Sequence, residues 1–413
     1  MVELLTLILA GGAGERLLPL TRVRTKPAVP FAGKYRLVDF ALSYCINSGV
    51  RNIYILTQYL SSSLIKHIQE GWDISSARMG DFIYCIPAQQ KIGKEWYLGT
   101  ADAVRQNTDL FNEKYEHVLL LSGDHVYKMN YLRMFEYHLM KEADVTISTT
   151  RCTVEEAKHL GVLEIDRDES ILGFEEKPSI PKTIPGNEEY CLTSMGVYIF
   201  RIEFLKHVLL NNLNDFGRDV FPHLVNGDYS LYSYDYTTYN IIKDYQVEIK
   251  DNRNVKTLYE KTTDSSYWRD VGNLDSYYQT NMDLLKKNPP FNLYGIRWPF
   301  RTYQAELSPG KCVQGGTIED SILCDGCVIR GGHVSSSILS PNVTVENGSI
   351  VEESIIFDDA VINPVVKIRR AIIDKNVEIS AGSTIGYDIQ SDMQKGCIVS
   401  DRGVVVVPKG MHL

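Results

Sequence analysis

The sequence predicts an α/β protein in two parts, a Rossmann-like domain with a mixed, mainly parallel sheet followed by a left-handed parallel β-helix. Two patterns lead to this prediction. Short β-rich runs alternate with helical stretches before residue 285, and an apolar residue recurs at every fifth or sixth position from Leu323 onward. The chain of 413 residues is also longer than one hydrophobic core usually supports, so a large and a smaller domain are expected.

Four apolar, β-rich runs predict buried strands in the first part, at residues 5–9, 53–56, 118–121 and 145–149. Amphipathic stretches such as residues 61–70 lie between them. Strands that alternate with helices of this length predict crossover connections and a mainly parallel sheet covered on both faces. Ligands of such sheets bind beyond the carboxyl ends of the strands, so the site is expected there.

The boundary between the two parts is expected in residues 286–310. Pro289 and Pro290 cannot continue a helix and favour an extended connector. We therefore predict a large domain over residues 1–285, a linker over 286–310 and the second domain over 311–413.

A repeat of apolar residues predicts the β-helix. After Leu323, eleven steps of five or six residues lead to Ile385, with Gly, Asn, Asp or Ser between them. This period suits short strands joined by tight corners, three to a coil. The alternative is an antiparallel sandwich of short strands. A sandwich usually has turn signals every 8 to 12 residues, and the turn signals in this sequence are denser. Because a β-helix presents flat surfaces that can stack, we expect this domain to function in assembly or regulation.

Composition excludes several classes of partner. A formal net charge of -9 and a pI near 5.6 argue against nucleic acid, which is bound by basic faces. The first apolar run, residues 4–10, is too short to span a membrane, and no basic segment precedes it as in a signal peptide. We expect a cytoplasmic protein that binds neither nucleic acid nor membrane.

A glycine-rich turn directly after the first strand indicates a phosphate site. Residues 11–17 read GGAGERL, and the chain then continues with further basic residues. Glycines let backbone N–H groups approach a phosphate closely, and cations complete the binding of a triphosphate. The pattern is neither the Walker loop nor the dinucleotide fingerprint. The three nearby cations are Arg16, Arg24 and Lys26.

Asp124 is a candidate metal ligand, because it follows the predicted strand at residues 118–121 and so lies at that strand's carboxyl end. An aspartate in such a place is more often a turn former.

Residues 11–40 resemble the opening of the sugar-phosphate nucleotidylyltransferases, and the segments KPAVPF and GKYRLVDF look like the ADP-glucose pyrophosphorylase branch. The resemblance spans nearly the whole chain. Further matching segments are TQY at 57–59, PAQQ at 87–90, WYLGTADAV at 96–104, GDH at 123–125, FEEKP at 174–178, SMG at 194–196 and YWRDVG at 267–272.

The resemblance implies an enzyme that transfers the adenylyl group of ATP to glucose 1-phosphate, releasing pyrophosphate and giving ADP-glucose for glycogen synthesis. Charge neutralisation and alignment would supply most of the catalysis, with Mg²⁺ as cofactor. Two alternatives stay open at this point. One is a related enzyme that makes a dTDP-, UDP- or GDP-sugar, since the base is chosen by a few hydrogen-bonding groups. The other is a non-catalytic regulatory subunit.

The resemblance also implies roles for individual residues. Asp124 and Asp270 would hold Mg²⁺, and Arg16 and Lys26 would bind the β- and γ-phosphates. The residues implied to bind glucose 1-phosphate are Tyr97, Gly161, Glu176, Lys177 and Ser194. Those implied to bind the nucleotide, besides Arg16, are Gly11, Gly12, Gly14, Gln89 and Gly99. Without the resemblance, Glu176 and Lys177 would be read as an exposed turn.

Assembly and regulation are implied in the same way. The resemblance implies a homotetramer and a phosphorylated metabolite bound between the two domains. Its candidate ligands are Arg24, Arg36, Arg369 and Arg370, because a guanidinium pairs with phosphate oxygens through two bonds at once. Solvated surface arginines, or arginines paired with some of the 52 acidic residues, are the alternative.

Overall fold

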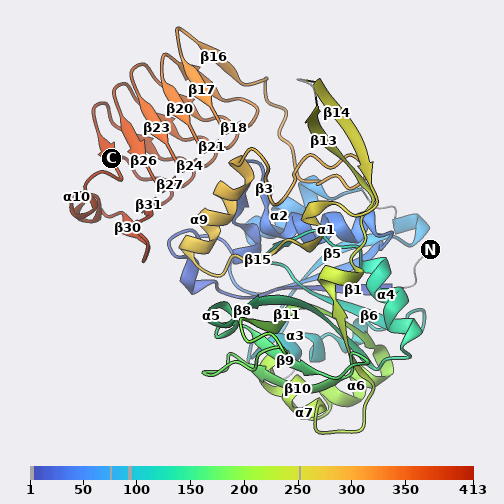
Figure 1. Ribbon diagram of the computed structural model, residues 1–413. Coiled ribbons are helices and arrows are strands. Elements are labelled where there is room, and N and C mark those ends of the chain that lie inside the picture. The colour runs from blue at the N-terminus through green and yellow to red at the C-terminus, as the bar shows by residue number, and fades with distance from the viewer. Residues whose placement is uncertain (1–3, 75–76, 92–94, 251–252) are drawn as a thin grey trace.

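The computed structural model of the protein describes residues 4–74, 77–91, 95–250 and 253–413. Two bodies lie side by side, a large sheet domain and a β-helix that forms the C-terminal end of the chain (Figure 1). Helix α9 (Leu274–Met282) lies beside the β-helix, where the Tyr278 hydroxyl donates a hydrogen bond to the Glu353 carbonyl oxygen at 2.6 Å. In the part of the chain that the structure describes, every helix is too short or too polar to cross a bilayer.

The large domain is built on a mixed sheet of nine strands, counted over the described residues. Its main path runs β10-β9-β11-β6-β1-β4-β5, and β8 adds β12 at its side. Strands β6, β1, β4 and β5 are parallel, whereas β11 runs antiparallel to β6, β8 and β9. The strands are β1 (Leu4–Ala10), β4 (Asn52–Thr57), β5 (Phe82–Pro87), β6 (His117–Ser122), β8 (Val145–Thr153), β9 (Gly161–Ile165), β10 (Ile171–Glu176), β11 (Tyr190–Arg201) and β12 (Leu231–Asp235).

Helices cover both faces of this sheet, as predicted. In β1, Leu5 and Leu7 belong to one apolar cluster, while Leu4 and Ile8 belong to another on the opposite face. The predicted helix at residues 61–70 is α2. The helices are α1 (Leu37–Asn47), α2 (Ser62–Gly71), α3 (Thr100–Arg105), α4 (Tyr131–Met140), α5 (Val154–Ala157), α6 (Ile202–Leu209), α7 (Phe221–Leu224), α8 (Tyr236–Tyr239), α9 and, beyond the sheet domain, α10 (Ile389–Gln394).

Three smaller pairs of strands complete the large domain. They are β2 (Pro30–Phe31) with β3 (Tyr35–Arg36), β7 (His125–Tyr127) with β15 (Trp268–Asp270), and β13 (Asp244–Lys250) with β14 (Arg253–Tyr259). The β7–β15 pair is functionally relevant, because its antiparallel register sets Asp270 opposite His125 although 145 positions separate them in the chain.

The second domain is the predicted parallel β-helix, with three sheets of stacked short strands. The apolar side chains of the predicted repeat point into the β-helix. Four of them stack in register on successive strands and are fully buried, namely Ile329, Val345, Ile362 and Ile379. The three sheets comprise β16 (Lys311–Val313), β19 (Val328–Arg330), β22 (Thr344–Val345), β25 (Val361–Ile362) and β28 (Glu378–Ile379); β17 (Thr317–Glu319), β20 (His333–Ser335), β23 (Ile350–Glu352), β26 (Lys367–Arg369) and β29 (Thr384–Ile385); and β18 (Ile322–Leu323), β21 (Ile338–Leu339), β24 (Ile355–Ile356), β27 (Ala371–Ile373), β31 (Val405–Val407) and β30 (Ile398–Val399).

The chain between the two domains, residues 286–310, contains no helix or strand, but it packs against the sheet domain rather than spanning open space. The Thr302 hydroxyl donates to the buried Asp39 carboxylate at 2.7 Å, and the rings of Phe291 and Phe300 both pack at an angle against the ring of Phe40. This segment therefore belongs to the packed structure.

The β2–β3 hairpin joins the two domains from the other side. Its tip, Gly33, has φ +83°, and the Ser340 hydroxyl of the β-helix donates to its carbonyl oxygen at 2.7 Å. A Cβ at Gly33 would lie 2.6 Å from the Cys324 sulfur, so only glycine fits here. One apolar cluster contains both Phe31 of the hairpin and Ile338 of the β-helix, so the core is continuous across the junction.

Candidate active site

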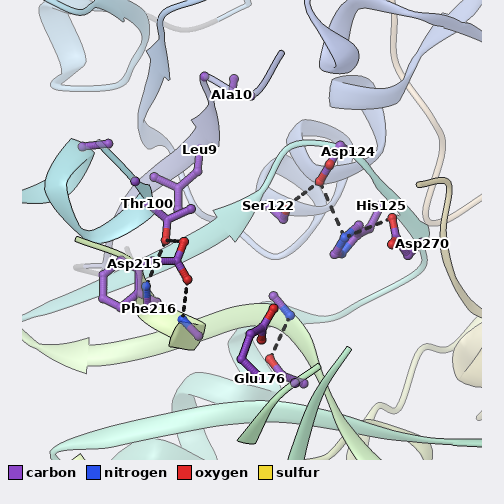
Figure 2. Close-up of a pocket in the computed structure, with 18 of the residues that line it drawn as sticks. Leu9, Ala10, Thr100, Ser122, Asp124, His125, Glu176, Asp215, Phe216 and Asp270 are labelled. Carbon is purple, nitrogen blue, oxygen red and sulfur yellow. Dashed lines mark hydrogen bonds and ion pairs between the residues drawn. The ribbon is translucent and has the colours of Figure 1, made fainter. Parts of the chain in front are cut away.

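A cavity of about 510 Å³ opens beyond the carboxyl ends of β1 and β6, where the sequence predicts the ligand to bind. The glycine loop forms one side, and the start of β9, the end of β10 and the middle of β11 form the other (Figure 2). Most of the predicted site residues line this cavity, namely Gly11, Gly12, Arg16, Tyr97, Gly99, Asp124, Gly161, Glu176, Lys177, Ser194 and Asp270. A side recess adjoins it and is bordered by Gly14 and Lys26.

The glycine loop leaves β1 and turns sharply at Gly14, whose φ is +66°. The turn is held by the Thr21 hydroxyl, which donates to the Gly14 carbonyl oxygen at 2.9 Å. A Cβ at Gly14 would lie 2.9 Å from the Cβ of Lys26, so the lack of a side chain lets the loop close onto the lysine. The short helix η1 (Glu15–Leu17) follows and sets Arg16 at the wall of both the cavity and the recess.

Two carboxylates from distant parts of the chain meet at one lysine. Asp124 follows β6, and Asp270 ends β15. The Lys26 ammonium lies 2.7 Å from Asp124 Oδ2 and 3.4 Å from Asp270 Oδ1. Lys26 is 8% exposed, whereas both carboxylate side chains keep about a quarter of their surface open. The carboxylates are therefore accessible from the cavity while the lysine lies behind them.

The electrostatics of this trio favour the charged forms. Burial opposes ionisation of Asp124, but Lys26 and His125 outweigh it and hold the pKa of Asp124 below its ordinary value. Burial likewise disfavours the ammonium of Lys26, yet Asp124 and Asp270 together raise the pKa of Lys26. The Ser122 hydroxyl also donates a hydrogen bond to Asp124.

His125 lies close to the same two carboxylates and was missed by the sequence analysis. Its Nε2 lies 3.6 Å from Asp124 and 3.7 Å from Asp270, and its Nδ1 is 3.0 Å from the Met195 carbonyl oxygen (Figure 2). Its position directly after Asp124 in the GDH segment is the signal that could have identified it.

Glu176 and Lys177 occupy the opposite wall of the cavity. Glu176 ends β10 and pairs with Gly161 of β9, where a Cβ would lie 2.5 Å from the ring of Phe174 and 3.0 Å from the Glu176 carboxylate. Lys177 has φ +51°, and its ammonium lies 3.2 Å from Glu176 Oε1. Its side chain remains 45% exposed, so the charge is available to a ligand.

Tyr97 and Ser194 are both held in place by hydrogen bonds. The backbone N–H of Tyr97 donates to Gln58 Oε1 at 2.7 Å, and the Asn107 amide donates to its hydroxyl at 2.9 Å. The Ser194 hydroxyl donates to the Tyr198 hydroxyl at 3.2 Å. Gly99 completes this wall, since a Cβ there would lie 2.4 Å from the carbonyl oxygen of Asn214. By contrast, Gln89 is exposed in the segment that follows β5, outside the lining of the cavity.

Comparison with known proteins agrees with this geometry. Residues 5–287 match the nucleotidyl transferase family, and residues 304–407 match the GlmU-like C-terminal hexapeptide family. A glucose-1-phosphate adenylyltransferase of Koribacter versatilis is 44% identical over 100% of this chain and 97% of its own length. Enzymes of the same name from Rhodopirellula baltica and Shewanella sp. (strain ANA-3) are 41% and 42% identical over 99% of this chain and 91% and 95% of theirs.

The chain belongs to the glucose-1-phosphate adenylyltransferase family. The resemblance stated from the sequence motifs is thus confirmed, and so is the combination of a nucleotidyl transferase domain with a hexapeptide β-helix. Nucleotidyl transferases generally use a divalent metal ion.

This family member has further cavity residues that the motifs did not single out. Three of them, Asp215, Phe216 and Gly217, lie at the start of the π-helix η5 (Phe216–Val220), where the N-cap Asp215 accepts hydrogen bonds from the backbone N–H groups of Gly217 and Arg218, both at 3.0 Å. Asp215 also accepts the Thr100 hydroxyl at 3.1 Å, which ties η5 to α3 (Figure 2). An aspartate directly before a helix is an ordinary N-cap signal, so the sequence offered no functional cue. The additional lining residues include Ser122, His159, Tyr198, Asp215, Phe216 and Gly217.

The four arginines suggested as effector ligands fall into two groups. Arg24 and Arg36 lie at the domain junction and pair with β-helix carboxylates, Arg24 with Asp374 at 2.9 Å and Arg36 with Asp358 at 3.7 Å. Lys375, which the sequence analysis missed, joins them by pairing with Asp358.

Burial and the nearby Arg36 lower the pKa of Lys375 to about 8, although the attraction of Asp358 acts in the opposite direction.

Arg369 and Arg370 form the second group, at the surface. Arg369 pairs with Glu353 at 3.7 Å, and the guanidinium of Arg370 lies over the ring of Tyr278 at 5.7 Å.

Proposed function

We propose that this chain transfers the adenylyl group of ATP to α-D-glucose 1-phosphate, giving ADP-glucose and pyrophosphate. This reaction supplies the activated glucose donor for glycogen-type α-glucan synthesis. The observation that carries the proposal is the arrangement of one cavity, with Asp124 and Asp270 between the glycine loop on one side and Glu176 and Lys177 on the other. Such a cavity offers separate places for a triphosphate and a sugar phosphate, with carboxylates where their reacting phosphates meet.

The binding roles follow from this division. Backbone N–H groups of the glycine loop, with Arg16 and Lys26, suit the β- and γ-phosphates. Lys177 suits the phosphate of the sugar substrate and Glu176 its hydroxyls. On this proposal the nucleotide is bound by Gly11, Gly12, Gly14, Arg16, Gln89 and Gly99, and glucose 1-phosphate by Tyr97, Gly161, Glu176, Lys177 and Ser194.

The residues fit a magnesium ion. Mg²⁺ prefers hard oxygen ligands and is usually held by one or two carboxylates together with substrate phosphates. Asp124 and Asp270 would be those carboxylates, because both reach the same ammonium and both face the cavity. Within the described residues, no group of three or more His, Cys, Asp or Glu side chains is placed to hold a metal ion by itself, so phosphates and water would complete the coordination. When bound, the ion supplies neutralisation of phosphate charge.

The reaction is a displacement at phosphorus. A phosphate oxygen of glucose 1-phosphate forms a bond to the α-phosphorus of ATP as the bond from that phosphorus to the bridging β-oxygen breaks. The electron pair leaves with pyrophosphate, so no covalent enzyme intermediate is needed. Lys177 aligns the attacking phosphate, and Arg16 and Lys26 stabilise the negative charge on the departing one, which makes positioning and electrostatics the main contributions of the protein.

Steady-state pyrophosphate release tests the proposal, with ATP, UTP, dTTP and GTP each offered with glucose 1-phosphate. We expect ATP to be preferred by at least about tenfold in kcat/KM. A preference for another nucleotide would assign the chain to a different sugar nucleotide. No turnover with any of the four, in a folded protein, would identify a non-catalytic subunit. Asp270→Asn serves as the inactive control.

We also propose how the chain is divided and assembled. Residues 1–285 form the catalytic domain, 286–310 the linker, and 311–413 the β-helix domain for regulation and assembly. Flat β-helix faces support a homotetramer, and ATP as substrate supports a cytoplasmic location, with neither nucleic acid nor membrane as a partner. Light scattering at assay concentration should give four times the mass of 46.8 kDa, and a monomer mass would contradict the tetramer.

A phosphorylated metabolite is the proposed effector, bound through Arg24, Arg36, Arg369 or Arg370. The cationic cluster at the domain junction supports this, since guanidinium groups recognise phosphate. The effector would shift the population of an active conformation. Rates measured with a panel of sugar phosphates, three-carbon phosphates, inorganic phosphate and AMP should respond to at least one, and Arg36→Ala/Arg369→Ala should lose that response. A reaction rate that responds to no compound of the panel would refute the proposed effector.

A further inference from the structure

Lys26 bridges the two carboxylates that are the proposed metal ligands. Its ammonium lies 2.7 Å from Asp124 and 3.4 Å from Asp270, although the three residues come from separate segments. The lysine is on the short helix η2 (Lys26–Ala28), and Asp270 is brought in by the pairing of β15 with β7. One ammonium therefore acts as the counter-ion of both carboxylates.

A divalent cation at the proposed site needs the same carboxylate oxygens. Hydrogen bonds from the ammonium occupy Asp124 Oδ2 and approach Asp270 Oδ1, and a positive charge at this distance also repels an incoming cation. The other neighbouring cationic candidate, His125, stays 3.6 Å or more from both carboxylates and makes no comparable contact. Lys26 is thus the group that a cation must displace.

Lys26 also borders a second place, in which a bound phosphate would attract its ammonium. The side recess is lined by the glycine loop from Gly12 to Gly14, by Arg16 and by Lys26, with Asp124 on the same wall. The backbone N–H groups of the glycine loop and Arg16 make this recess suited to phosphate. A phosphate bound there would offer the ammonium new oxygens without exposing it, because the stem of Lys26 packs against Gly14.

We propose that Lys26 is a positioning residue that makes binding of the divalent cation depend on the nucleotide. Its ammonium neutralises Asp124 and Asp270 and competes with the cation for them, and nucleotide phosphate in the recess draws the ammonium away. The cation then binds together with the triphosphate rather than before it. This inference rests on the proposed function, because it takes Asp124 and Asp270 as the metal ligands.

Binding of Mn²⁺ alone tests the competition, with the free ion followed by electron paramagnetic resonance. We expect Lys26→Met to bind Mn²⁺ at least about tenfold more tightly than the wild type when no nucleotide is present. Arg16→Met is the matched control, because it removes a cation from the same recess that makes no ion pair with either carboxylate. A gain of similar size in Arg16→Met would mean a general field effect and would overturn the inference.

The coupling between metal and nucleotide gives a second readout. Mn²⁺ should tighten the binding of a non-hydrolysable ATP analogue by a larger factor in the wild type than in Lys26→Met, measured by calorimetry with and without the ion. The analogue's own affinity for Mn²⁺ is common to both proteins and cancels in the comparison. Equal factors would overturn the inference.

Two further variants keep the outcomes distinct. Lys26→Gln, which retains a hydrogen-bond donor without the charge, replaces Lys26→Met if circular dichroism shows that Met impairs folding. Lys26→Met/Asp124→Asn should lose the tight Mn²⁺ binding. If it does not, the ion binds elsewhere and the metal assignment in the proposed function fails. Equal Mn²⁺ affinity in Lys26→Met and wild type, abolished by Asp124→Asn, would instead leave that assignment intact and refute only the competition.

Discussion

Removing one partner of the buried ion pair between Arg24 and Asp374 should destabilise the junction of the two domains strongly. The Arg24 guanidinium lies 2.9 Å from the Asp374 carboxylate, and the two residues are 4% and 0% exposed. Among the described residues, the second oxygen of Asp374 has no hydrogen-bond partner. Arg24→Met would leave this carboxylate buried without its counter-ion, which costs about 3–5 kcal/mol of unfolding free energy.

Urea unfolding followed by fluorescence and circular dichroism measures this change. Arg24→Met/Asp374→Leu removes both charges and should return to within about 1 kcal/mol of the wild type, because no lone charge is then buried. Arg369→Met is the control for an exposed pair, since Arg369 and Glu353 lie 3.7 Å apart with about half of each side chain exposed, and it should cost less than about 1 kcal/mol. A loss in Arg24→Met no larger than in Arg369→Met would refute the reasoning.

Three further outcomes are expected. Asp270→Asn should lower kcat at least about 100-fold without unfolding the protein, as tested by steady-state rates at saturating Mg²⁺, and near-normal turnover would contradict its role. Lys177→Ala should raise the KM for glucose 1-phosphate while leaving that for ATP within about twofold, and an effect confined to ATP would move Lys177 to the nucleotide site. The pKa of Lys375 is about 8 in the folded protein, below its ordinary value of 10.5. Between about pH 8 and pH 10.5 the folded state therefore binds fewer protons than the unfolded chain, and the free energy of unfolding rises with pH. Relative to Lys375→Met, the wild type should therefore gain about 2 kcal/mol of unfolding free energy from about pH 7 to about pH 10, whereas a pH-independent difference would argue against this pKa.

The periodic parts of the fold could be predicted because they depend on local patterns. The repeat ending at Ile385 became the interior of the β-helix, and the predicted strand at residues 118–121 lies within β6. The linker was harder. Pro289 and Pro290 indicate a boundary, but nothing local shows that Phe291 and Phe300 pack against Phe40, which is 251 positions away from Phe291.

The candidate site could be predicted where whole motifs carry it. Asp270 was assigned from its motif, and the pairing of β15 with β7 brings it to Asp124. Residues that line the cavity only because of tertiary packing, such as Asp215 and Tyr198, left no local signal. The role assigned to Gln89 stays a prediction, since its side chain is exposed outside the described lining.

The close contact between the Gly33 hairpin and the β-helix bears on the construction of chimeric enzymes. Recombining two relatives within residues 286–310 would pair one parent's β-helix with the other parent's hairpin. A parent with any side chain at the hairpin tip would collide with Cys324, and a parental β-helix without a hydroxyl at position 340 would lose the hydrogen bond to the Gly33 carbonyl oxygen. A crossover that exchanges residues 24–36 together with the β-helix keeps both contacts and the Arg24 pair within one parental set. Domain exchange in this chain therefore involves at least two segments, and α9 remains as a further contact with the β-helix.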